Sequence, residues 1–466
     1  MFQKILIANR GEIAVRIARA CRELGIRSAA VHSEVDREAL HVRVADEAHE
    51  IGPAPARESY LRGERIVALA REIGADAVHP GYGFLAENAA FAEACARAGL
   101  RFIGPPAAVI REMGDKVRAR RRMERAGLPV VPGATERLAD AEALAAARRL
   151  GFPVLVKATG GGGGRGMRVV REESGLAAAL ARARSEAGAA FGDDGVYVER
   201  LVAGARHVEV QLLADAKGSA LHLFERDCSA QRRHQKLLAE APAPGVGPEL
   251  RAELGAAALA AARAVGYESA GTVEFLLAPD GRFYFLEMNT RIQVEHPVTE
   301  AVTGVDLVQA MIRIAAGEPL ALRQQDLALR GAAFEARIYA EDPARGFLPS
   351  PGRIAKLETP AGPGLRVDAG VAAGDRVSVH YDALLAKLVA HGETREEALS
   401  RLERALAAFH VEGVRTTLPF HRWLVREPAF RAGGIDVGFV ERSWPKGGAA
   451  PREEASPGSG RGAPVT

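Results

Sequence analysis

The chain has 466 residues, 48% hydrophobic and 26% charged, a balance that is typical of globular proteins rather than of membrane-spanning or disordered chains. Its net charge of +3, from 62 basic and 59 acidic residues, is too small to indicate nucleic acid as a partner, although anionic small molecules remain candidates. The three cysteines Cys21, Cys95 and Cys228 form no Cys-x-x-Cys pair, and no charged leader precedes Ile5, so we expect a cytoplasmic protein without disulfides or a zinc site.

Residues 1–113 alternate short apolar segments with helical ones. Strands are predicted over 5–8, 28–32, 77–79 and 102–103, and helices over 13–24, 60–73 and 88–98. This βαβ order predicts an open parallel sheet with helices on both faces. The first turn, residues 9–14, lacks the Gly-x-Gly-x-x-Gly pattern, so the fold alone assigns no ligand.

A small second unit is predicted over 114–203, since residues 126–133 are rich in Pro and Gly and favour a boundary or hinge. An apolar strand ends at Lys157 and is followed by the glycine run 160–164 and a second apolar strand. Glycines let backbone N–H groups close on anionic oxygens. The loop therefore predicts phosphate binding, with a flexible hairpin tip as the alternative.

Glu199 is the one acidic residue in the apolar segment 196–202. Its carboxylate could accept a hydrogen bond from a nucleotide base or ribose. Taken alone, a solvated glutamate at a strand end is the favoured interpretation.

Residues 204–445 are predicted to form a mixed α+β domain, and residues 446–466, rich in Gly, Pro and Ser, a disordered tail. Strands are expected over 207–213 and 221–224, and helices over 254–265 and 307–315.

The segment 272–289 consists of two alternating apolar runs that meet at Asp280-Gly281 and predicts a β-hairpin. Folding about that turn places Glu274 near Glu287, with Asn289 on the same face. Two carboxylates about 4 Å apart repel by roughly 4 kcal/mol at an effective dielectric near 20, which a bound cation would relieve. Oxygen ligands without His or Cys favour Mg²⁺ or Mn²⁺. Two solvated glutamates on an exposed edge are the alternative.

Residues 226–236 concentrate cationic and amide side chains. Strand alternation predicts that His234 and Lys236 share a face suited to an anionic ligand. A basic surface patch is the alternative.

Residues 289–297 continue from the hairpin. If they stay extended, Arg291, Gln293 and Glu295 share the face of Asn289. A guanidinium beside a carboxylate can clamp a small oxyanion while the carboxylate takes its proton. An Arg–Glu surface pair is the alternative.

These segments resemble the biotin carboxylases, which belong to the ATP-grasp superfamily, from residue 1 to about residue 444. The similarity lies in Lys157 with its glycine loop, in 226–236 (RDCSAQRRHQK) and in 287–300 (EMNTRIQVEHPVTE). Shorter motifs at 9–14, 79–84 and 114–116 match as well.

The resemblance implies that ATP binds between a mobile lid, about 130–203, and the large domain. The implied nucleotide contacts are Lys116, Lys157, Gly163, Gly164, Glu199, Arg200, Leu201, Val202, His207, Gln231, His234, Glu274 and Glu287. Two Mg²⁺ or Mn²⁺ ions are implied on Glu274, Glu287 and Asn289.

The resemblance also implies a bicarbonate site made of Lys236, Arg291, Gln293, Val294 and Glu295. Glu295 would deprotonate bicarbonate for attack on the γ-phosphate, and the carboxyphosphate formed would break down to CO₂ and phosphate. The phosphate would then remove the biotin N1′ proton, Arg337 would stabilise the biotin enolate, and Tyr82 would lie near the ring. Arg291, Glu295, Lys236 and Arg337 are the implied catalytic residues.

The chain contains no Met followed by Lys, the attachment pattern for biotin, so a separate biotin carboxyl carrier protein is expected. Carboxyltransferase subunits and a homodimer are expected as well. The expected function is the first half-reaction of acetyl-CoA carboxylase, which feeds fatty acid biosynthesis, with another acyl-CoA or pyruvate carboxylase as the alternative. A different ATP-grasp ligase that passes an acyl phosphate to an amine, and a regulatory nucleotide-binding subunit without turnover, are further alternatives.

Overall fold

The computed structural model describes residues 1–134, 136–159, 167–191, 194–445 and 447. The predicted glycine loop, with Gly163 and Gly164, and all but one residue of the predicted tail lie outside this range. Among the described helices, none combines the length and apolar character needed to cross a membrane.

The first hundred residues form a five-stranded parallel sheet of order β3-β2-β1-β4-β5. Its elements are β1 Lys4–Ile7, α1 Gly11–Glu23, β2 Arg27–Ser33, α2 Leu40–Val44, β3 Glu47–Gly52, α3 Gly63–Glu72, β4 Ala77–His79, α4 Ala89–Arg97 and β5 Arg101–Phe102. Ile5 and Ile7 pack toward α1, whereas Leu6 packs with Leu69 and Phe91 on the other face. The predicted parallel sheet with helices on both faces is confirmed. Strand β3 escaped prediction because Ile51 is its one buried side chain.

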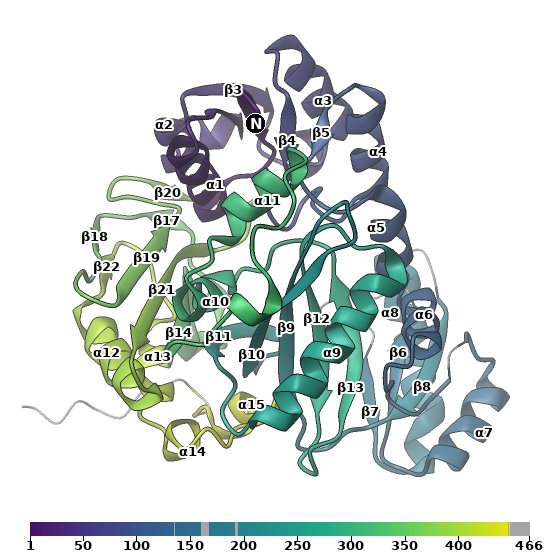
Figure 1. The fold of residues 1–466 in the computed structure, drawn as a ribbon. Coiled ribbons are helices and arrows are strands. Elements are labelled where there is room, and N and C mark those ends of the chain that lie inside the picture. Colours follow the sequence, from purple (N-terminus) through teal and green to yellow (C-terminus); the bar gives the residue numbers. More distant parts are fainter. Residues whose placement is uncertain (135, 160–166, 192–193, 446, 448–466) are drawn as a thin grey trace, which may run out of the picture.

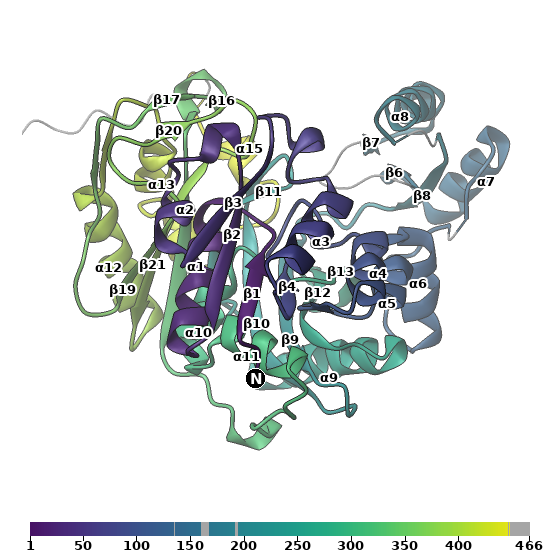
Figure 2. The same ribbon diagram turned by 90° about the horizontal axis from the view of Figure 1, so that it is seen from above.

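Two helices, α5 (Ala107–Gly114) and α6 (Lys116–Arg125), lead into a small antiparallel sheet of order β7-β6-β8. Its elements are α7 Asp140–Leu150, β6 Val154–Ala158, β7 Arg168–Val170, α8 Leu176–Phe191 and β8 Val196–Arg200. The valines of β6 and β8 pack against α7 and α8 and form a separate small core. This small unit, the predicted lid, lies at the edge of the molecule beside α6 in both views (Figures 1 and 2).

The centre of the molecule is an eight-stranded antiparallel sheet of order β13-β12-β9-β10-β11-β14-β21-β19 (Figure 1). Its strands are β9 Arg206–Ala214, β10 Ala220–Arg232, β11 Gln235–Ala241, β12 Ser269–Leu277, β13 Phe283–Asn289, β14 Ala332–Tyr339, β19 Leu365–Ala369 and β21 Leu384–Gly392. The helices are α9 Pro248–Val265, α10 His296–Thr303, α11 Leu307–Ala315, α12 Arg395–Ala408, α13 Leu418–Leu424, α14 Pro428–Arg431 and α15 Phe439–Ser443. Three two-stranded ribbons complete it: β15 Glu341–Asp342 with β16 Leu348–Pro349, β17 Gly352–Arg353 with β20 Arg376–Val377, and β18 Lys356–Glu358 with β22 His410–Glu412.

Strand β9 gives this sheet two chemically different faces. Val208, Val210 and Leu212 join the apolar core that α9 covers. Because side chains alternate along a strand, His207, Glu209 and Gln211 point to the opposite face, where all three are nevertheless buried. The sheet therefore carries a buried polar face.

Candidate active site

The predicted hairpin forms, with Glu274 directly opposite Glu287 on β12 and β13. Asn289 Nδ2 donates to Glu274 Oε1 at 2.8 Å. The carboxylates meet basic side chains: His207 Nε2 lies 2.8 Å from Glu274 Oε2, and Lys116 Nζ lies 3.5 Å from Glu287 Oε2. The interpretation of two solvated glutamates is wrong for Glu274, which is 3% exposed.

Lys236 on β11 lies at the centre of the polar face. Its Nζ donates to Glu209 Oε2 at 2.5 Å and to Glu274 Oε1 and Glu295 Oε1 at 2.7 Å each. Burial lowers the pKa of an ammonium, but these three carboxylates raise the pKa of Lys236 well above its ordinary value. Glu209 and Glu274 form one cluster with His207, and Glu209 and Glu295 form another with Cys228. Within each cluster the side-chain N, O or S atoms lie within 4.8 Å of one another. The Lys236 ammonium contacts the carboxylates of both clusters.

The predicted shared face of His234 and Lys236 is wrong. Arg233 and His234 form a two-residue turn with φ values of 47° and 65°, between β10 and β11. A turn of this kind, with positive φ at both residues, closes tight hairpins. Lys236 therefore pairs across the strands with Gln231, and His234 is exposed at the turn.

Gln231 also reaches the polar face, from the other strand of this hairpin. It is 3% exposed, and its Nε2 lies 3.4 Å from His207 Nδ1. Two residues of the predicted nucleotide site thus lie in contact.

Glu295 is fully buried at the end of the segment that follows β13. Its Oε1 accepts from Lys236, and its Oε2 accepts from Arg337 Nη2 at 2.7 Å. Burial alone would raise the pKa of Glu295, but Lys236, Arg337 and Arg226 lower it well below its ordinary value. The carboxylate is therefore ionised and held in one orientation.

The predicted extended continuation beyond Asn289 is wrong. Strand β13 ends there, residues 290–295 turn, and α10 begins at His296. Gln293 nevertheless reaches the hairpin, where its Nε2 donates to Glu274 Oε1 at 2.9 Å. The convergence comes from a turn and not from strand alternation.

Arg291 lies beside this turn. It donates from Nη1 to Gln293 Oε1 at 3.0 Å and from Nη2 to Asn289 Oδ1 at 3.1 Å. Its carboxylate partner is Glu87, at 2.9 Å from Nε, and not Glu295. Arg291 therefore keeps its side chain beside Asn289, at the end of the Glu274–Glu287 hairpin.

The lid contributes a buried ion pair. Lys157 Nζ lies 2.9 Å from Glu199 Oε1, and Arg120 Nη1 lies 3.1 Å from Glu199 Oε2. Glu199 is 4% exposed, so the solvated interpretation is wrong. Burial disfavours the charge of Lys157, but Glu199 raises the pKa of that lysine above its ordinary value. Arg200 is exposed at the end of β8, and Leu201 and Val202 are half-buried after it.

The remaining predicted residues come from three different parts of the chain. Tyr82 OH donates to Glu12 on α1, and the Val294 carbonyl accepts from Lys387 Nζ at 3.0 Å. Arg337 on β14 pairs across the sheet with Lys387 on β21. Arg337 contacts Glu295 directly, whereas the hydrogen-bond partner of Tyr82 is Glu12.

The sequence reasoning missed several residues of this site. Glu209 holds both Lys236 and Arg226, the latter at 2.6 Å, and Glu87 and Arg120 pair with predicted residues. The alternation of His207, Glu209 and Gln211 with valines and Leu212 could have indicated Glu209. No local signal marks Glu87 or Arg120, whose partners are 204 and 79 residues away.

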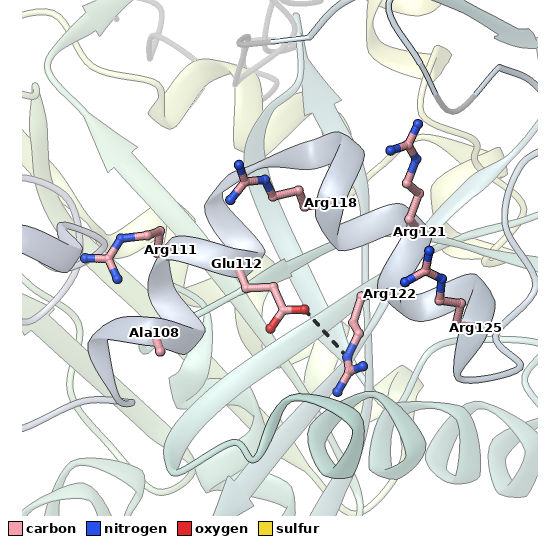
Figure 3. A pocket seen from close by; sticks show the side chains of 7 residues that line it. All are labelled: Ala108, Arg111, Glu112, Arg118, Arg121, Arg122 and Arg125. Atoms are coloured by element: carbon pink, nitrogen blue, oxygen red, sulfur yellow. Dashed lines mark ion pairs between the residues drawn. The ribbon is translucent and has the colours of Figure 1, made fainter.

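A separate hollow of about 490 Å³ lies on the outer side of α5 and α6. Figure 3 shows its lining: Ala108, Arg111, Glu112, Arg118, Arg121, Arg122 and Arg125. Four of these arginines pair with acids, namely Arg111 with Glu93, Arg118 with Asp115, Arg121 with Glu136 and Arg122 with Glu112. None of the predicted catalytic residues lines this hollow, so it is a charged surface away from the chemistry.

Comparison with known families covers most of the chain. Residues 1–110 match the biotin carboxylase N-terminal domain, residues 115–323 the ATP binding domain of the carbamoyl-phosphate synthase L chain, and residues 335–442 the biotin carboxylase C-terminal domain.

Among curated proteins, the chain is 54% identical over 444 residues to a biotin carboxylase of Pseudomonas aeruginosa, covering 95% of this chain and 98% of that protein. It is 52% identical to a pyruvate carboxylase subunit of Methanothermobacter thermautotrophicus, covering 95% of this chain and 90% of that protein.

Two solved biotin carboxylase structures are similar to this chain over almost its whole length. The biotin carboxylase domain dimer of Hydrogenobacter thermophilus 2-oxoglutarate carboxylase, in complex with MgADP, ADP and bicarbonate, superposes with a TM-score of 0.92 at 47% identity, over 95% of this chain and 98% of that one. A biotin carboxylase–ATP complex from Campylobacter jejuni also gives 0.92, at 44% identity, over 95% and 99%. The chain therefore belongs to the biotin carboxylase family of ATP-grasp ligases.

Proposed function

We propose that the chain carboxylates biotin, carried by a separate protein, with bicarbonate and ATP. The observation that carries the proposal is the position of Glu295, which is buried between Lys236 and Arg337. An ionised carboxylate in that position can take a proton from a small acid that two cations hold. The presence of bicarbonate in the similar Hydrogenobacter thermophilus domain supports this substrate.

In this proposal ATP lies between the lid and the central sheet. Lys157 and Lys116 would contact phosphate oxygens, and Glu199, with Leu201 beside it, would contact the nucleoside. His207 and Gln231 line the polar face below, and the exposed His234 stands at its rim. The unit 114–203 would close over the nucleotide, which excludes water from a short-lived intermediate.

Glu274, Glu287 and Asn289 fit a hard divalent cation because they offer oxygen donors on paired strands. Mg²⁺ or Mn²⁺ held there would neutralise charge on the transferred phosphate. Two such ions are proposed, as the family resemblance implies.

The carboxylation chemistry would proceed through carboxyphosphate. Glu295 takes the bicarbonate proton, and the freed oxygen bonds to the γ-phosphorus while the bond to ADP breaks. Carboxyphosphate then separates into CO₂ and phosphate, and the phosphate removes the N1′ proton of biotin before the ring nitrogen attacks CO₂. Lys236, Arg291 and Gln293 would orient bicarbonate, and Arg337 would balance the enolate charge of biotin, with Tyr82 near the ring.

The proposed partners are a biotin carboxyl carrier protein, carboxyltransferase subunits and a second copy of this chain. A dimer is supported by the dimeric Hydrogenobacter thermophilus domain. We propose acetyl-CoA as the final acceptor. Relatives named as components of pyruvate carboxylase and methylcrotonoyl-CoA carboxylase favour pyruvate or another acyl-CoA as alternatives. A cytoplasmic location is supported by three buried, unpaired cysteines.

Release of ADP by the purified chain tests the proposal. With ATP and Mg²⁺, release that requires bicarbonate and rises with free biotin is expected. Release that is indifferent to both would favour a different ATP-grasp ligase.

A further inference from the structure

A lysine outside the predicted site is buried directly behind it. Lys387 on β21 has no exposed surface, and it pairs across the sheet with Arg337. Its Nζ lies 3.1 Å from Glu12 Oε2 on α1 and 3.9 Å from Asp368 Oδ2 on β19. Its third contact is a hydrogen bond of 3.0 Å to the backbone carbonyl of Val294.

The two carboxylates account for the charge of Lys387 but not for its placement. A buried ammonium is costly unless it is paired, and Glu12 and Asp368 supply that pairing. Although burial would raise the pKa of Asp368, Lys387 and Arg366 lower it to about 2, so this carboxylate stays ionised. Charge balance alone would not require a contact to Val294.

The contact to Val294 fixes the peptide that precedes the proposed base. A trans peptide is planar, and its N–H points in the direction opposite to its C=O. Holding the Val294 carbonyl therefore also fixes the direction of the Glu295 N–H. The preceding carbonyl, of Gln293, is held by His296 Nδ1 at 2.8 Å. Two successive peptides of the turn are thus held through their carbonyls.

Two N–H groups of the same turn are left without a hydrogen-bond acceptor among the described residues. Within the described ranges, neither the Val294 N–H nor the Glu295 N–H donates to another protein group. Backbone N–H groups that converge on one point bind small oxyanions. The orientation of this turn therefore governs both the N–H donors and the direction of the Glu295 carboxylate.

We propose that Lys387 is a positioning residue that holds the Val294–Glu295 peptide in the orientation that binds bicarbonate. The inference rests on the proposed function, since it assigns bicarbonate to this turn. Glu12 extends the connection, because its other oxygen accepts from Tyr82 OH. The same ion pair thus links the bicarbonate turn to the expected biotin side of the site.

The test compares Lys387→Met, Glu12→Gln/Lys387→Met and wild type, with bicarbonate KM, kcat, ATP affinity and Tm measured for each. Lys387→Met keeps most of the buried volume but removes the donor to Val294. It should raise the bicarbonate KM about tenfold or more, because the Val294–Glu295 peptide is no longer held in the orientation proposed to bind bicarbonate, and leave ATP affinity within about twofold.

The double variant separates positioning from stability. Lys387→Met leaves Glu12 buried without its cation, which lowers Tm, and the additional Glu12→Gln change removes that charge while keeping an acceptor for Tyr82. The double variant should therefore recover Tm but not the bicarbonate KM.

Arg395→Met is the matched control, since it unpairs the buried Glu240, whose Oε2 lies 2.6 Å from Arg395 Nε. It should lower Tm with the bicarbonate KM unchanged. An unchanged bicarbonate KM in Lys387→Met, or its recovery in the double variant, would overturn the inference. If ADP release by the wild type does not depend on bicarbonate, the proposed function itself is wrong, and the inference falls with it.

Discussion

Glu295 Oε2 accepts a hydrogen bond from Arg337 Nη2 at 2.7 Å, although 42 positions separate the two residues in the sequence. The pair joins the proposed base for bicarbonate to the residue proposed to stabilise biotin. Lys236 donates to the other carboxylate oxygen of Glu295, Oε1. The two half-steps of the reaction therefore share one buried electrostatic unit, and a change in either member should affect both.

Glu295→Gln should reduce bicarbonate-dependent ADP release by about 100-fold or more, because the amide cannot take the proton. Nucleotide affinity, measured by titration calorimetry, should be nearly unchanged, since the lid residues are untouched. Glu403→Gln, on α12, is the control and should behave as wild type. Full turnover in Glu295→Gln would remove Glu295 from the role of base.

Lys157→Met should weaken ATP binding about tenfold or more, since a charge-assisted hydrogen bond contributes about 1.5–3 kcal/mol. The bicarbonate KM should stay the same because Lys157 lies on the lid. Lys356→Met, which removes a surface lysine that is 48% exposed, should leave both constants unaltered. Equal ATP affinity in Lys157→Met and wild type would contradict the phosphate role.

Glu287→Gln should raise the Mg²⁺ concentration needed for half-maximal ADP release, because it removes one anionic donor opposite Glu274. The side chain of Glu287 is 37% exposed and pairs with Lys116 at 3.5 Å, so Tm should change little. Removal of the metal with a chelator should stop ADP release, and added Mg²⁺ should restore it. An unaltered Mg²⁺ requirement would exclude Glu287 as a ligand.

Glu335 predicts a pH dependence of stability. It has no exposed surface, and within the described residues neither carboxyl oxygen has a hydrogen-bond partner. Burial raises the pKa of Glu335 to about 8, despite the opposing effect of Lys387 and Arg337. Above its ordinary pKa the unfolded chain loses this proton while the folded chain keeps it, so the free energy of unfolding falls as the pH rises toward about 8.

Glu335→Gln should abolish that contribution, which amounts to as much as about 1.4 kcal/mol per pH unit. Urea unfolding at several values between about pH 5 and about pH 8 measures it, and wild type should lose more stability than the variant over this range. Parallel curves for the two proteins would show that Glu335 is ionised in the folded state.

Local patterns predicted the elements but not all of the contacts. The Asp280-Gly281 turn predicted the hairpin correctly, because hairpin geometry is local. The meeting of Glu274 and Glu287 also depends on a register shift between Glu274 and Phe275, which the sequence did not indicate. The turn after Asn289 and the turn at His234 broke the alternation that the prediction assumed.

Tertiary contacts decided the remaining positions. Glu199 is buried because Lys157 and Arg120 compensate its charge. The residues next to Glu199 in the sequence do not indicate either partner. The position of Lys387 behind Val294 depends on pairing between strands that are distant in the chain, which single-sequence patterns do not encode.

The most direct measurement follows the oxygen atoms of bicarbonate. The chain is incubated with ATP, Mg²⁺, biotin and ¹⁸O-labelled bicarbonate, and the released phosphate is analysed by mass spectrometry. If Glu295 directs a bicarbonate oxygen to the γ-phosphorus, each phosphate should carry one labelled oxygen. Phosphate that carries no bicarbonate oxygen, only oxygen from water, would show that bicarbonate does not attack ATP and would contradict the account.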